Sequence, residues 1–186
     1  MTGLSTAAWV GHDLGLATNV GGVLFGRLAL HPATRKLPND SERGLVISDA
    51  WRRFNSFQVV SSAVAALTWF VGRTRMSGRE VDRTSRALVP IKDVLMLGTL
   101  GTSVASAMLG RRLSALAPDG GALPVSDDGR HLSPQAPQQA KRLNAVVDKV
   151  GIASLACAAG VVAITAVLAM RAGQSQRWVL FSRLLP

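Results

Sequence analysis

The chain has 186 residues, of which 48% are hydrophobic and only 17% charged, so composition alone allows a compact soluble domain or a small membrane bundle. Its 21 lysines and arginines outnumber the 11 acidic residues and give a formal charge of +10. These basic residues occur in every connection between the apolar segments, whereas a nucleic-acid-binding protein more often gathers them on one patch interleaved with aromatic residues. The distribution argues against nucleic acid and favours the lipid bilayer as a partner.

The first predicted transmembrane helix covers about residues 6–30, with Trp9 near one membrane interface and Arg27 near the other. The chain begins without the positively charged region of a secretory signal, so we expect this apolar run to be retained. Pro32 is expected to stop the helix because proline lacks a backbone N–H. An exposed loop should follow it, since the next ten residues are rich in turn-forming types.

Apolar residues recur at helical spacing from Ser41 to Phe57, with charged residues mostly on other faces. This pattern predicts an amphipathic segment in the membrane interface, which then bends into a second span over about residues 57–72. The connection over residues 72–92 carries six basic residues and is the most basic short loop of the chain. A third span, about residues 91–110, is expected to begin at Pro90, whose fixed φ suits the first turn of a helix.

Seven proline and glycine residues between positions 115 and 139 predict a polar, mobile loop that is poorly suited to a rigid site. The fourth span, residues 150–170, has 21 uncharged residues in a row. At about 1.5 Å per residue it can cross a hydrocarbon core of about 30 Å. Residues 174–186 mix arginine with tryptophan, leucine and phenylalanine, and predict an interfacial tail.

These segments predict an all-α fold, a single helical membrane domain with about four transmembrane helices and an interfacial amphipathic segment. Both termini should then lie on one side of the membrane. The connections on one side carry 12 basic residues and those on the other side 9, which is too small a difference to assign an orientation.

A candidate polar membrane site is formed by His12, Asp13 and Asn19 on the first helix. Ionisable groups at membrane depth are costly and often functional, so a proton relay or ion site is one interpretation. The alternative places His12 and Asp13 in the headgroup region, where water solvates them. Asn19 lies about two turns deeper and is expected to form hydrogen bonds between helices rather than to bind a ligand.

No metal site or cofactor is expected, because the chain has no suitable set of ligands. His12 and His31 would be roughly 28 Å apart along one helix, and His131 lies in the predicted loop. Cys157 is the only cysteine and is expected to act as a small buried apolar residue. No nucleotide-binding, nucleophile-elbow or zinc-protease motif occurs, so we expect a protein that is not an enzyme.

Small residues on two of the predicted helices indicate close helix packing, because they let backbones approach each other. Four glycines at three- or four-residue spacing are the candidates for such contacts: Gly22, Gly26, Gly98 and Gly101. Hydroxyl side chains between residues 99 and 106 could form hydrogen bonds across these contacts or, alternatively, line a substrate path.

The sequence resembles the transmembrane protein 205 family over most of the chain. Three segments carry the resemblance: Ala8-Trp9, the run from Gly22 to Leu28, and the run from Ala140 to Leu155. The connection after Arg43 departs from that family, since it lacks an aromatic- and proline-rich segment before the second span. The resemblance implies a small helical membrane protein with no established enzymatic role, and it supplies no catalytic residues.

The leading functional hypothesis is a non-enzymatic, multi-pass membrane protein that acts as a packing, scaffold or accessory subunit, either as a homo-oligomer or with a membrane-protein partner. The alternative is a small transporter or proton-coupled carrier that uses the polar site on the first helix. A soluble basic binding module is the third hypothesis.

Overall fold

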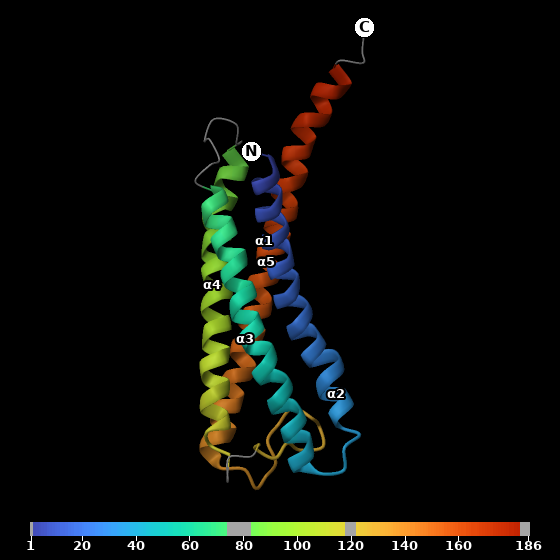
Figure 1. Ribbon diagram of the computed structural model, residues 1–186, viewed down its shortest axis with the longest axis vertical. Helices are drawn as coiled ribbons and strands as arrows, with labels where there is room; N and C mark the ends of the chain where they lie inside the picture. Colours follow the sequence, from blue (N-terminus) through green and yellow to red (C-terminus); the bar gives the residue numbers. More distant parts are fainter. Residues whose placement is uncertain (1, 74–82, 118–121, 183–186) are drawn as a thin grey trace.

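The computed structural model describes residues 2–73, 83–117 and 122–182, and side chains within residues 6–72, 86–117 and 122–171. Figure 1 shows an elongated helical bundle in which α1 begins and α5 ends at the same end. The elements are α1 (Thr2–Phe25), the π-helical turn η1 (Gly26–Leu30), α2 (His31–Thr34), α3 (Asp40–Arg73), α4 (Arg83–Ser114) and α5 (Gln138–Ser182). In the described residues the only β pairing is one isolated bridge, Val125 to Leu132, so the all-α prediction is confirmed.

The four long helices form a closed ring of contacts, in which α1 packs against α3, α3 against α4, α4 against α5, and α5 against α1. Three of the described helices are long and apolar enough to cross a membrane: α3 over Asp40–Gly72, α4 over Arg86–Ser114 and α5 over Gln138–Arg171. These helices contain the predicted spans 57–72, 91–110 and 150–170. Helix α1, which was predicted to be the first span over residues 6–30, is not among these three helices.

Two prolines do not have the predicted effect. Pro32 does not stop the first helix, because the chain passes through η1 and α2 and remains helical to Thr34. A π-helical turn places one extra residue in each hydrogen-bonded ring, which helps the helix to accommodate a missing N–H. Pro90 does not open the third helix either, since it lies inside α4, seven residues after Arg83.

The amphipathic segment predicted at the membrane interface is continuous with the second span in α3, without the expected bend. Its aromatic face packs against the first helix. A Cβ atom on Gly22 would lie 2.0 Å from the ring of Phe54, and one on Gly26 would lie 2.4 Å from the ring of Trp51. The two glycines therefore make room for aromatic residues of α3, and these contacts hold the segment within the bundle.

The other two predicted packing glycines face different surroundings on α4. A Cβ atom on Gly98 would lie 2.9 Å from Sγ of Cys157 on α5, so this position is part of the α4–α5 contact. Gly101 is exposed, and a Cβ atom there would have no atom within 4 Å. Gly101 thus takes no part in packing among the described residues of this chain.

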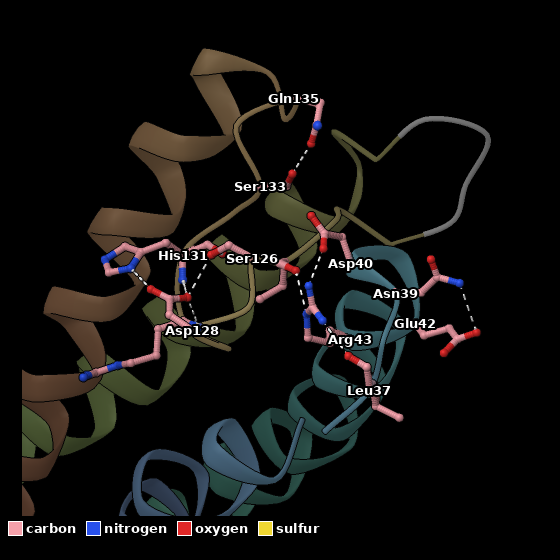
Figure 2. Close-up of polar contacts among 12 residues, drawn as sticks. Leu37, Asn39, Asp40, Glu42, Arg43, Ser126, Asp128, His131, Ser133 and Gln135 are labelled. Carbon is pink, nitrogen blue, oxygen red and sulfur yellow. Dashed lines mark hydrogen bonds and ion pairs between the residues drawn. The ribbon is translucent and has the colours of Figure 1, made fainter. Parts of the chain in front are cut away.

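The connection between α4 and α5 has a defined conformation over residues 122–137, in contrast to the mobile loop expected for residues 115–139. Figure 2 shows how Arg43 of α3 holds this segment. The side chain of Arg43 is only 6% exposed; its Nε donates to the carbonyl of Val125 at 3.0 Å, and its Nη atoms contact Asp40 and the carbonyl of Leu37. A charged donor with three acceptors is well compensated for its burial.

Backbone contacts also fix this loop. A Cβ atom on Gly44 would lie 2.1 Å from the carbonyl oxygen of Leu123, so the loop lies directly on α3. Gly129 adopts φ +68°, a left-handed conformation that favours glycine, and its Cα faces the carbonyl of His31. The loop is therefore shaped by close backbone approaches that only glycine allows.

The Asp128 carboxylate organises the turn at the tip of the loop (Figure 2). It accepts hydrogen bonds from the backbone N–H groups of Arg130 at 2.8 Å and His131 at 2.9 Å, and from the hydroxyl of Ser126 at 2.9 Å. Partial burial acts to raise the pKa of Asp128, but these hydrogen bonds outweigh it and hold the pKa well below its usual range. The turn therefore stays charged and intact at physiological pH.

Two predicted segments fall partly outside the described residues. Residues 74–82 of the basic connection are not described, and the part from Arg83 onward is helical. Of the predicted interfacial tail, residues 174–182 continue α5, while their side chains and residues 183–186 lie outside the described part of the chain.

We expect Arg43→Ala to release the loop, because the carbonyl groups of Val125 and Leu37 then lose a charged donor. The free energy of unfolding in detergent should fall by about 2–3 kcal/mol, and trypsin should cleave faster after Arg130. Arg53→Ala is the matched control, since the Arg53 side chain is 79% exposed and pairs with Asp49 at the surface. An unchanged rate of cleavage in Arg43→Ala would contradict the assigned role.

Candidate functional site

A network of buried polar side chains lies at the centre of the bundle and joins all four long helices. The Asn19 amide of α1 donates to Oγ of Ser62 on α3 at 3.0 Å, and its Oδ1 lies 3.2 Å from Oγ of Ser103 on α4. Gln58 of α3 donates to Oδ1 of Asn19 at 3.2 Å and to Oγ of Ser154 on α5 at 3.4 Å. All five side chains are at most 2% exposed.

The Asn19 amide is satisfied within this network. Its Nδ2 also donates to the carbonyl of Gly15 at 3.0 Å, and its Oδ1 is within hydrogen-bond distance of three neighbouring side chains. A side chain with this many partners has little capacity left for a ligand. The geometry therefore favours the interhelical hydrogen-bonding interpretation of Asn19 over a binding role.

The other two residues of the predicted polar site lie in different environments. His12 is 1% exposed and lies inside the bundle, so the interpretation that water solvates it in the headgroup region is wrong. Its Nδ1 is 2.9 Å from the carbonyl oxygen of Ala65, which can only accept, so Nδ1 carries a proton. Asp13, one residue further along the helix, is exposed. His12, Asp13 and Asn19 therefore do not converge on one site.

His12 belongs instead to a cluster around Lys92, the last basic residue of the connection predicted over residues 72–92. Lys92 is fully buried, with Nζ 3.6 Å from the ring centroid of Trp69 and 5.6 Å from that of Trp9. The Trp69 indole donates to Oδ1 of Asp93 at 2.8 Å. Within the described residues, Nζ of Lys92 and Nε2 of His12 are buried and have no hydrogen-bond partner.

The Lys92 cluster is held together by cation–π attraction between the ammonium group and two indole rings. Such contacts are strongest when the cation is desolvated, as it is here. A signal for this burial exists in the sequence, because Lys92, Met96, Thr99 and Ser103 follow one another at helical spacing and all four are buried. A helix that begins at Arg83 rather than at Pro90 includes Lys92 in this buried row.

A cavity of about 510 Å³ opens between the helices at the loop end of the bundle, the lower end in Figure 1. Arg27 and Asp148 close one side, with Nη2 of Arg27 2.6 Å from Oδ1 of Asp148. His31 also lines the cavity, and its Nδ1 bonds the carbonyl of Gly129 in the loop. Burial lowers the pKa of His31, although the bond to Gly129 opposes this shift, so the ring is neutral at physiological pH.

Basic, apolar and uncharged polar side chains line the cavity. The basic members are Arg27, Arg52, Arg111 and Arg130, and the only carboxylate among the lining residues is Asp148. The larger apolar members are Val23, Ile47, Trp51, Leu113, Leu123, Val125, Leu132 and Val147. Sequence reasoning missed this site because its lining comes from every long helix and from a loop that was expected to be mobile.

No group of three or more His, Cys, Asp or Glu side chains that could hold a metal ion occurs in the part of the chain that the structure describes. Cys157 is partly buried beside Gly98. No family model, curated protein or solved structure matches this chain. The resemblance to the transmembrane protein 205 family therefore stays a prediction.

We expect Asn19→Ala to lower the free energy of unfolding by about 2 kcal/mol in detergent micelles, because several buried partners lose hydrogen bonds of about 0.6 kcal/mol or more each. Thr18→Ala is the control, since within the described residues the Thr18 hydroxyl donates only to the Leu14 carbonyl of its own helix. Titration with a denaturing detergent measures both. Equal stability of the two variants would show that the network does not hold the helices together.

Proposed function

We propose that this chain is a multi-pass integral membrane protein that acts through helix packing, as a scaffold or accessory subunit and not as an enzyme. Its three long apolar helices support insertion into a bilayer. Helix α1 would cross the bilayer beside them as the fourth helix. The hydrogen-bond network around Asn19 would keep the side-chain amide of this residue away from lipid. Interior placement is how membrane proteins accommodate polar residues in such helices.

The observation that carries this proposal is the apolar outer surface of α3 and α4. Exposed residues on α4 follow the spacing of one helix face: Val94, Leu97, Gly101, Val104 and Met108. A matching row on α3 comprises Phe57, Val60, Val64, Leu67 and Val71. Exposure of two such apolar rows to water would be unfavourable, whereas contact with lipid or with another helix would not.

Gly101 is the small residue at the centre of the α4 row. Small residues at membrane-helix interfaces let backbones approach closely, and no atom of the described residues fills the space beside Gly101. The α4 row is therefore the face that we assign to a second copy of the chain or to another membrane protein.

Crosslinking in carbonate-washed membranes tests this assignment. In a Cys157→Ser background, Gly101→Cys should form a disulfide-linked species of one defined size, or link to a partner of defined size through a thiol-reactive crosslinker. Gly21→Cys is the matched control, because Gly21 is also exposed and also has no atom within 4 Å of its Cβ position. A chain that carbonate removes, or that stays strictly monomeric, contradicts the proposal.

A proton-coupled carrier is the second candidate, and the Lys92 cluster is the observation that favours it. Nδ1 of His12 holds the proton of the neutral ring, so its buried Nε2 offers a lone pair. The Lys92 ammonium lies within electrostatic range of His12 and has protons without acceptors among the described residues. Buried groups of this kind often mark proton pathways in membrane proteins.

Proton flux into liposomes that contain the purified chain and a pH-sensitive dye tests the carrier. A carrier should lose its flux in His12→Ala and in Lys92→Met, and keep it in His131→Ala and Lys149→Met, which alter exposed residues. Asp13→Asn tests the remaining member of the predicted site. Equal flux in all variants, or none above protein-free liposomes, removes the support for this candidate.

A further inference from the structure

Each long helix has an uncharged stretch that ends toward the loop end of the bundle. The cavity extends across the level at which these uncharged stretches end. Arg27, Arg53, Arg111 and Lys149 mark this level on the four helices. Lining residues occur on both sides of it, with Val23 and Gly151 on the uncharged side and the loop residues beyond it. In a membrane, one part of an occupant would therefore lie at hydrocarbon depth and the other at the water boundary.

The charge of the lining selects an anion. The lining contains four arginines but only one carboxylate, Asp148, and this carboxylate already pairs with Arg27. Arg52 shares Asp49 with Arg53 at the surface. Within the described residues, the guanidinium groups of Arg111 and Arg130 have no hydrogen-bond or ion-pair partner. Guanidinium groups bind carboxylate and phosphate in a two-pronged geometry.

The size of the cavity and the loop that covers it restrict the apolar part of the ligand. About 510 Å³ falls within the range of roughly 300–1,000 Å³ that is typical of small-molecule sites. Loop residues from Leu123 to Leu132 cover the cavity, and Arg43 and Gly44 fix them to α3. A single flexible chain suits the apolar part of this cavity, whereas a two-chain phospholipid would be too bulky for it.

We propose that this cavity binds a single-chain anionic amphiphile, with its carboxylate or phosphate headgroup beside Arg111 and Arg130 and its acyl chain directed toward Val23 and Gly151. The chain would bury apolar surface against Trp51 and its neighbours, and the headgroup would replace water around the arginines. This proposal rests on the proposed insertion into a membrane, and it is compatible with both the scaffold role and the carrier role.

Quenching of Trp51 fluorescence by a bromine-labelled stearate tests the site in the full chain, held in nanodiscs of phosphatidylcholine. Saturable quenching is expected, and Trp51→Phe should remove it. Oleate competition identifies a carboxylate headgroup and oleoyl lysophosphatidate competition a phosphate headgroup, and either result supports the proposal. Equal competition by oleyl alcohol, which lacks the charge, or by inorganic phosphate, which lacks the chain, overturns it.

A matched pair of double variants tests the arginines. Arg111→Gln with Arg130→Gln removes the two charges assigned to the headgroup, and Arg112→Gln with Arg142→Gln removes two from exposed positions that do not line the cavity. The first pair should weaken amphiphile binding by about tenfold or more, as expected for lost charge-assisted contacts. The second pair should change it less than about twofold. Equal weakening by both pairs would show a diffuse charge effect and overturn the site.

The far-UV circular dichroism of both double variants should match that of the unaltered chain, since the guanidinium groups of these four arginines make no hydrogen bond or ion pair within the described residues. If the first pair does not fold, the Trp51 quenching and its competition in the unaltered chain still decide the proposal.

Discussion

The hydrogen bonds of the Asn19 amide are the interaction on which the bundle depends. A membrane-spanning bundle gains little from hydrophobic burial between helices, because lipid chains are as apolar as the side chains they replace. Polar contacts and close packing must then specify which helices meet. Asn19 does this for α1, α3 and α4 directly, and Gln58 extends the contact to Ser154 of α5.

Close packing around this network depends on small residues at a few positions. Gly22 and Gly26 admit the rings of Phe54 and Trp51, and these contacts bring the lower half of α3 against the first helix. Trp51 also lines the cavity, so the contact between Gly26 and Trp51 forms part of the cavity wall. Gln58 of the network lines the cavity as well, so the network and the cavity adjoin each other.

The two ends of the bundle differ in character. At one end a buried ammonium, Lys92, lies between two indole rings and is separated from water. At the other end the arginines lie around a cavity whose roof is tied down by the buried guanidinium of Arg43. Desolvation makes the first environment a place where a proton can be held, while partial solvation makes the second a place where an anion can enter.

The sequence by itself determined the helical class, the position of the three apolar spans and the role of Asn19, because hydropathy and local spacing are written along the chain. It could not reveal that Pro32 and Pro90 lie within continuing helices, since local signals for the end or the beginning of a helix are overridden by packing against neighbours. The burial of Lys92, the ordered loop and the cavity were decided only by the tertiary structure. Each arises from residues far apart in the chain, as when Arg43 meets Val125 or Lys92 meets Trp9. Such contacts depend on how the helices are rotated against one another, and local sequence patterns do not encode that rotation.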